Sequence, residues 1–115
     1  MISNGVDLIE IDKAKRIYVA HKDRLGLFFS SREIAYIQKG RDPHEKFAVL
    51  LAAKESAFKA VSRVGIGLSV FKDIEMIPHR NNHFSVKFNG LSRKPGLKFF
   101  ILKNQKYVVV QCAGT

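Results

Sequence analysis

The amino-acid sequence predicts an α+β domain in which an antiparallel sheet packs on one long central helix. Three features support this fold class: an apolar, strand-like segment over 2–9, helical periodicity in the middle of the chain, and strand-like alternation in its last third. The chain has 115 residues, 46% of them hydrophobic, and no internal repeat or linker divides it. We therefore expect a single domain over 1–115.

Two helices are expected before the central one. Residues 13–20 form the first, with Asp12 near its N-cap. Ser30 or Ser31 caps a second, short helix that stops at Gly40.

The central helix should begin at Pro43, a residue suited to a first helical turn, and run to about Arg63. Apolar side chains recur along it at three- and four-residue intervals, so it is expected to lie in the core. Four strands are then predicted, at residues 73–78, 83–89, 97–102 and 107–112.

The charge of the chain points to an anionic partner. Twenty Lys and Arg residues face ten Asp and Glu, a formal net charge of +10. Nucleic acid, an acidic protein, a phosphorylated ligand and a membrane surface all fit this excess, and charge alone does not choose among them.

The single cysteine, Cys112, lies in an apolar run, and we expect it to be a small buried hydrophobic residue. One cysteine excludes an intramolecular disulfide and a cysteine-based zinc site. No stretch approaches the roughly 18 apolar residues of a membrane span, so the predicted location is the cytoplasm.

Charged side chains interrupt two apolar segments. Glu55 and Lys59 share one face of the central helix, and Lys54 projects about 100° away from them. Asp7 interrupts the first predicted strand. Two carboxylates of this kind could share a divalent cation; the alternatives are an ion pair between Glu55 and Lys59, and a cap or turn role for Asp7.

Four segments together resemble a known family. They are Gly5-Val6-Asp7-Leu8-Ile9-Glu10-Ile11, the stretch LAAKESAFKA over 51–60, GIG over 65–67 and FKDIE over 71–75. In this order and spacing they resemble the 4′-phosphopantetheinyl transferases, and most of all the small, single-repeat holo-acyl-carrier-protein synthase type. The resemblance implies Mg²⁺-dependent transfer of 4′-phosphopantetheine from coenzyme A to a serine of an acyl carrier protein, with release of adenosine 3′,5′-bisphosphate.

The resemblance also implies roles for individual residues. Asp7 and Glu55 would be the Mg²⁺ ligands that hold the coenzyme A pyrophosphate. Glu55, directly or through a water, would take the proton of the attacking serine. Lys59 would neutralise charge on the departing phosphate. Lys54 would contact phosphate at the edge of the site, or else cover apolar surface with its stem.

Three further residues are expected near the coenzyme. Gly65 and Gly67 by default end the central helix, and the resemblance adds that their loop borders the coenzyme site. Arg41 lies where the family often has basic residues for the 3′-phosphate.

The acidic carrier protein is expected to dock on the basic first helix and the residues after it. Rim charges of this kind mainly raise the association rate; the alternative is a merely solvated face. The resemblance also implies a homotrimer with active sites between subunits. The predicted docking residues are Lys13, Arg16, Lys22 and Arg24.

The likeness fades after residue 75. Lys103 stands where the family has a histidine, and Leu50 where it has an arginine. Two other readings therefore stay open. One is a carrier-protein-binding homologue that has lost turnover. The other is a basic nucleic-acid-binding domain that stacks bases on aromatic side chains such as Phe99, Phe100 and Tyr107, although core packing explains these three better.

Overall fold

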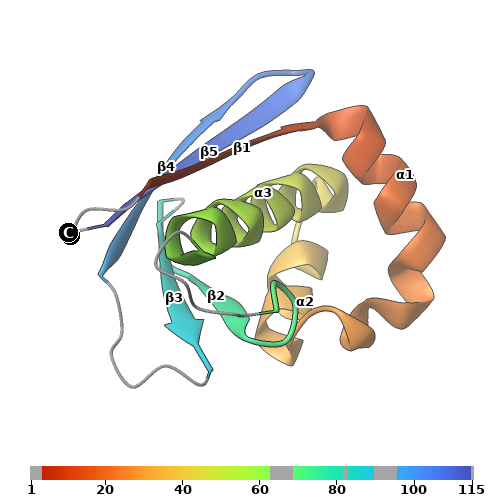
Figure 1. Ribbon diagram of the computed structural model, residues 1–115. Coiled ribbons are helices and arrows are strands. Elements are labelled where there is room, and N and C mark those ends of the chain that lie inside the picture. Colours follow the sequence, from red (N-terminus) through yellow and green to blue (C-terminus); the bar gives the residue numbers. More distant parts are fainter. Residues whose placement is uncertain (1–3, 63–68, 82, 90–95, 115) are drawn as a thin grey trace.

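The computed structural model describes residues 4–62, 69–81, 83–89 and 96–114. Its central helix, α3 (Pro43–Ser62), lies between a sheet of three strands on one side and α2 with a two-stranded sheet on the other (Figure 1). The predicted α+β fold with one long helix at its centre is confirmed.

The strands form two antiparallel sheets. In the larger sheet β5 (Tyr107–Gly114) lies between β1 (Asn4–Glu10) and β4 (Leu97–Lys103). In the smaller sheet β2 (Ile74–Pro78) pairs with β3 (Phe84–Phe88). The predicted strands are thus present, but they are divided between two sheets, because alternation predicts a strand without naming its partner.

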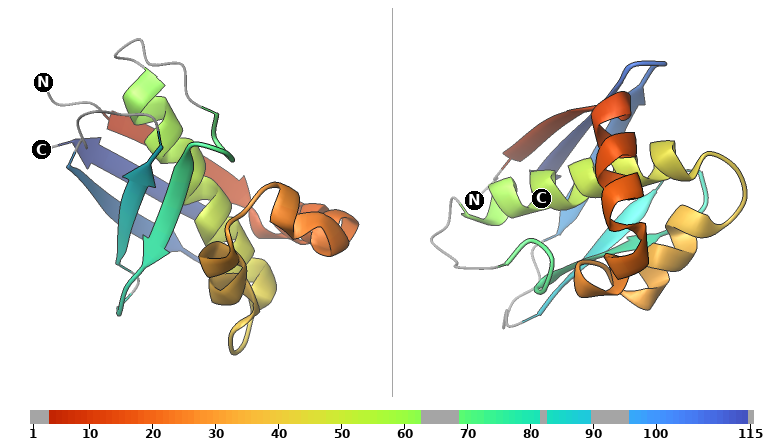
Figure 2. Two further views of the ribbon diagram at one scale, coloured as in Figure 1. Left: turned by 90° about the horizontal axis from the view of Figure 1, so that it is seen from below. Right: turned by 90° about the vertical axis from the view of Figure 1, so that its right-hand side faces the viewer.

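The first helical region differs from the prediction in where it starts and in an additional 3₁₀ helix at its end. Helix α1 (Ile11–His21) begins two residues earlier than predicted, with Glu10 at its N-cap and Asp12 in its first turn. The 3₁₀ helix η1 (Lys22–Leu27) follows directly. Together they lie on the side of the molecule away from β3 and β4 (Figures 1 and 2).

Helix α2 (Ser31–Gln38) has Ser30 as its N-cap, one of the two serines predicted for this position. The Ser30 hydroxyl accepts the backbone N–H of Glu33, and the Glu33 carboxylate accepts the backbone N–H of Ser30, so the two form a capping box. The helix ends at Gln38, before Gly40, whose φ of 79° suits glycine.

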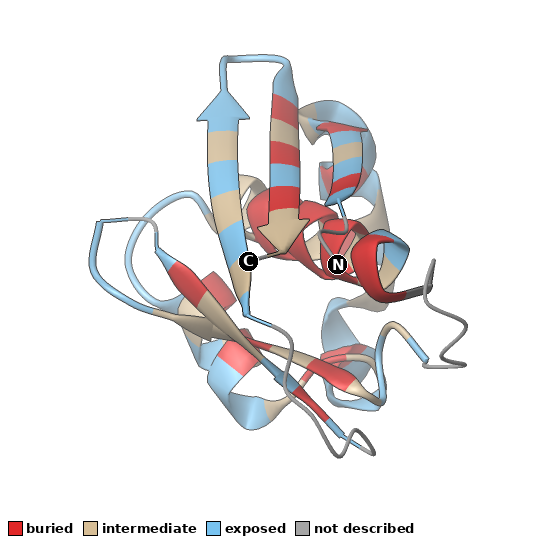
Figure 3. Cartoon of the chain, turned by 60° about the vertical axis from the view of Figure 1, so that its left-hand side comes forward, coloured by how far each residue is buried: buried red, intermediate tan, exposed pale blue. Residues whose placement is uncertain are grey.

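Alternation along β5 separates its two faces (Figure 3). Val108, Val110 and Cys112 point toward α3 and are fully buried. Burial raises the pKa of the Cys112 thiol to about 12, so this thiol is chemically inert, as the sequence predicted.

Strand β1 meets α3 at Gly5. A Cβ atom placed on Gly5 would lie 1.9 Å from the Ser56 carbonyl oxygen and 2.9 Å from the Ala60 nitrogen. Strand backbone and helix backbone therefore touch here, and only glycine leaves room for the contact. The close approach brings the inward side chains of β1 directly against α3.

Replacing Gly5 by Ala should destabilise the protein by roughly 1–3 kcal/mol, because the backbone atoms opposite Gly5 cannot rotate away as a side chain can. Gly26→Ala is the matched control, since nothing lies within 4 Å of the position of its Cβ. Urea unfolding should show a lower midpoint for Gly5→Ala and an unchanged one for Gly26→Ala. Equal midpoints would contradict the close contact.

Candidate active site

Asp7 lies on the inward face of β1, two residues from Gly5 and two from Ile9, both of which are buried against the core. Its side chain is only 20% exposed. The strand thus directs the Asp7 carboxylate toward α3 beside the closest contact between the two elements.

Lys59 on α3 meets this carboxylate. Its Nζ donates to Asp7 Oδ1 at 2.9 Å and to the Val6 carbonyl oxygen at 3.1 Å. The Lys59 side chain is 48% exposed, so solvent reaches part of it. Asp7 is thus an ion-pair partner of Lys59, and the Lys59 charge also acts on Glu55, whose pKa it lowers.

Glu55 lies one helical turn before Lys59 and is half-buried. Burial raises the pKa of Glu55, the nearby negative charge of Asp7 raises it further, and Lys59 lowers it. This effect of Asp7 indicates that the two carboxylates lie near each other, although their positions are 48 apart in the sequence. Two repelling carboxylates with a lysine beside them form a site that an added cation would stabilise.

The donor set fits Mg²⁺, which in proteins usually takes one or two carboxylates and completes its coordination with water and substrate phosphates. In the described ranges no group of three or more His, Cys, Asp or Glu is placed to hold a metal ion. A cation between Asp7 and Glu55 would thus take further ligands from its substrate. Lys59 lies where it could contact the same substrate phosphates.

Lys54 is not at this site. Its side chain is fully buried, and its Nζ donates to Glu33 Oε1 at 3.0 Å, to Glu33 Oε2 at 2.9 Å and to the Ile74 carbonyl oxygen at 2.6 Å. Burial lowers the pKa of Lys54, and the Glu33 carboxylate opposes that effect. The prediction that Lys54 contacts phosphate is wrong, because solvent does not reach its ammonium and all three donors are used.

Glu33 is the functional candidate that the sequence did not reveal. The Ser30-x-x-Glu33 spacing indicates a capping box, which by itself accounts for a glutamate at this position. Its second role, as the partner of a lysine 21 residues later, required the fold.

Of the other predicted coenzyme residues, Arg41 is not brought together with Asp7 and Glu55 in one chain. Arg41 lies before α3, at the opposite end of the helix and roughly 20 Å from Glu55 by helix rise. Gly65 and Gly67 lie outside the described residues. The predicted roles of these three residues stay predictions.

The two departures from the family pattern have local partners. The Lys103 Nζ lies 2.5 Å from Glu45 Oε1 at the start of α3. Leu50 is fully buried in the core. Lys103 thus pairs with the first turn of α3, and Leu50 packs in the core, each apart from Glu55.

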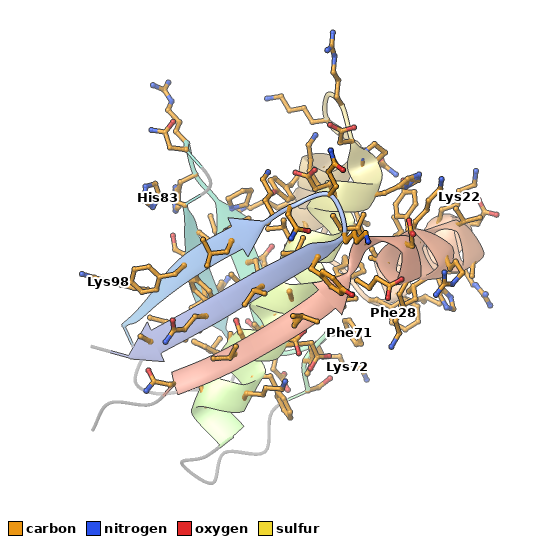
Figure 4. The ribbon with its side chains drawn as sticks, turned by 90° about the horizontal axis from the view of Figure 1, so that it is seen from above. Lys22, Phe28, Phe71, Lys72, His83 and Lys98 are labelled. Carbon is orange, nitrogen blue, oxygen red and sulfur yellow. The ribbon has the colours of Figure 1, made fainter. Side chains whose placement is uncertain are left out.

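A basic surface covers α1 and η1, and an apolar pocket lies beside it. The four predicted docking residues, which define the basic surface, are all exposed: Lys13, Arg16, Lys22 and Arg24. The apolar pocket has a volume of about 210 Å³, and its lining includes Ile17, His21, Leu25, Phe28, Leu51 and Phe71. The Phe28 and Phe71 rings meet edge to face at 5.4 Å (Figure 4).

Replacing Glu55 by Gln should stabilise the metal-free protein at neutral pH. Because the pKa of Glu55 is raised above its ordinary 4.5, its contribution to stability is present below the unfolded pKa and is lost as pH rises through the folded one. Melting curves in EDTA should show a higher Tm for Glu55→Gln than for wild type at pH 7, and equal values at about pH 3.5.

Glu10→Gln is the control for that measurement, since it removes an exposed carboxylate from the opposite face of β1. It should leave Tm unchanged at both pH values. A Glu55→Gln protein no more stable than wild type at pH 7 would show that burial and Asp7 do not disfavour the Glu55 charge.

Comparison with known proteins identifies the family of the chain. The model of the 4′-phosphopantetheinyl transferase superfamily matches residues 3–112. The holo-[acyl-carrier-protein] synthase of Chlamydia muridarum is 42% identical over 78 residues, which are 66% of this chain and 62% of that protein. The same enzyme of Moorella thermoacetica is 34% identical over 94 residues, 82% of this chain and 73% of that one. The match thus spans less than two thirds of the Chlamydia relative.

Solved structures match over nearly the whole chain. A coenzyme A complex of the ACPS of Chronobacterium ammoniagenes has a TM-score of 0.80 at 25% identity and covers 99% of this chain and 96% of that one. The Helicobacter pylori holo-[acyl-carrier-protein] synthase in complex with coenzyme A has a TM-score of 0.76 at 24% identity, with both chains covered completely, which supports the fold. This chain belongs to the 4′-phosphopantetheinyl transferase superfamily and has the fold of its holo-acyl-carrier-protein synthases.

Proposed function

We propose that the protein transfers 4′-phosphopantetheine from coenzyme A to a serine hydroxyl of an acyl carrier protein. The observation that supports this most is the meeting of Asp7, Glu55 and Lys59 between β1 and α3. These residues match the family motifs, and they combine two carboxylates for a hard cation with an ammonium for phosphate.

Asp7 and Glu55 would hold Mg²⁺, which when bound neutralises the pyrophosphate of coenzyme A. Glu55, directly or through a water, would take the serine proton. A bond forms between the serine oxygen and the β-phosphorus, and the bond from that phosphorus to the bridging oxygen breaks. The leaving group is adenosine 3′,5′-bisphosphate, whose developing negative charge Lys59 stabilises.

The carrier protein would dock on the basic surface of α1 and η1. A cationic rim beside an apolar pocket suits an acidic helical protein that inserts an apolar side chain. Binding of a nucleic acid to the basic residues would not require the pocket. Lys22 lies far from His83 and Lys98, on the opposite side of the molecule (Figure 4).

The outer face of the three-stranded sheet supports the proposed homotrimer. Leu8 pairs across the sheet with Val109, and Val109 pairs with Leu102, so the three form one apolar row. Leu8 is 59% and Leu102 74% exposed in the single chain. A row of this kind, with Val6 and Phe100 beside it, favours burial against further copies.

Mass spectrometry tests the activity. An apo carrier protein incubated with this protein, coenzyme A and Mg²⁺ should gain the mass of one phosphopantetheine. Asp7→Asn and Glu55→Gln should each reduce the rate by at least roughly 100-fold, since each removes a metal ligand, and Glu10→Gln should keep it. A wild-type protein that binds the carrier without modifying it would identify the homologue that has lost turnover.

The docking surface is tested by charge reversal. Arg16→Glu with Lys22→Glu should lower kcat/KM for the carrier protein about tenfold at low salt, because electrostatic steering is lost. The difference from wild type should shrink as salt is added. Lys39→Glu, at the C-cap of α2, makes an equal change per residue away from the basic surface, and an equal loss in that variant would refute a specific docking site.

The oligomer is tested by light scattering. The double variant Leu8→Lys/Leu102→Lys places two charges in the apolar row and should convert a trimer into monomers, with loss of transfer if the sites lie between subunits. Leu27→Lys, an equivalent change at an exposed leucine of η1, should remain trimeric. Full activity in a wild-type monomer would rule out the proposed assembly.

A further inference from the structure

The interior of the molecule contains one lysine without contact to solvent in the described residues. The Lys54 Nζ, fully buried, donates to both carboxylate oxygens of Glu33 and to the Ile74 carbonyl oxygen, at distances of 2.6–3.0 Å. An ammonium has three donors, and all three have a partner here. The aromatic rings of Phe29 and Phe71 lie 5.3 and 5.9 Å from the same nitrogen.

Glu33 joins three elements at this point. It is 1% exposed; its Oε1 accepts the backbone N–H of Ser30, and its Oε2 accepts the backbone N–H of Met76 at 2.9 Å. The start of α2, the strand β2 and the helix α3 therefore all bond to the Glu33–Lys54 pair. Each bond is directional, so the pair tolerates little rotation of α3 relative to its neighbours.

The rotation of α3 about its own axis determines the direction in which Glu55 points. Lys54 and Glu55 are consecutive and so project about 100° apart around the helix. On the other side of α3, the close backbone contact at Gly5 and the bonds of Lys59 to Asp7 and the Val6 carbonyl oxygen also restrict rotation in the described residues. A roll of about 20° would move a side-chain end by about 2 Å, given the radius of a helix with its side chains.

We propose that Lys54 is a positioning residue, whose buried pair with Glu33 fixes the rotation of α3 and so holds Glu55 and Lys59 opposite Asp7. The inference rests on the proposed function for the reaction that this geometry serves. It explains why a buried charge occurs where an apolar side chain would pack as well: two apolar side chains fill the space without fixing an angle.

Replacing Lys54 and Glu33 by a neutral pair separates an effect on the position of Glu55 from an effect on the stability of the protein. Lys54→Met alone leaves the Glu33 carboxylate buried without a cation, so its Tm should fall sharply. Lys54→Met/Glu33→Gln removes both charges and retains an acceptor for the capping box, and it should regain at least half of the lost Tm. Lys39→Met, at an exposed lysine, is the control and should match wild type throughout.

The functional measurements are made on the stable double variant. We expect kcat for transfer to fall on the order of 10- to 100-fold, as for a misplacement of about 1 Å, with KM for coenzyme A changed less than about threefold. Mn²⁺ binding in the presence of coenzyme A, followed by electron paramagnetic resonance, should weaken in parallel.

Three results would overturn the proposal. Wild-type kcat and Mn²⁺ affinity in the double variant would mean that the pair is only structural. A raised KM with unchanged kcat would mean that Lys54 contacts the coenzyme. Failure of the double variant to regain stability would mean that the pair contributes net stability instead of orientation. A wild-type chain that binds Mn²⁺ without transfer would refute the proposed function, while the Mn²⁺ comparison would still decide the role of Lys54.

Discussion

The backbone contact between β1 and α3 at Gly5 is the constraint on which the candidate site depends. Any larger residue would hold the strand away from the helix, because the atoms opposite it belong to the backbone of α3. With glycine there, the inward face of β1 places Asp7 against the last turns of α3. Lys59 then completes the contact by bonding both Asp7 and the Val6 carbonyl oxygen.

The fold places the Glu55 carboxylate where its charged form is disfavoured. Glu55 is half-buried and faces a second carboxylate, so its charged form is disfavoured until a cation arrives. Such an arrangement would sacrifice some stability for the proposed binding of metal and phosphate. The same helix buries Lys54 on its other side, where the charge is fully paired with Glu33. Lys54 and Glu55, which are adjacent in sequence, thus lie in opposite environments: the charge of Lys54 is paired, whereas that of Glu55 is opposed by Asp7.

Two surfaces outside the site lie on different parts of the molecule. The basic surface on α1 and η1 lies beside an apolar pocket, whereas the apolar row of the outer sheet face lies on the far side of β1, β5 and β4. Every helix in the described parts of the chain is too short or too polar to cross a lipid bilayer. Because the two surfaces are separate, the proposed protein substrate and the proposed further copies of the chain could bind at the same time.

The sequence alone determined the three α-helices and most strand positions, and it singled out the carboxylates of Asp7 and Glu55 as candidate site residues. Periodicity, caps and charges within apolar runs are local signals, so no tertiary structure was needed for these predictions. It did not reveal η1, whose six residues have no apolar period, or the division into two sheets. Nor did it reveal the role of Lys54: a lysine within an apolar helix reads the same whether it faces a ligand or a buried carboxylate. Only the tertiary structure, by bringing Glu33 from α2 against α3, decided that Lys54 turns inward while Glu55 turns toward Asp7.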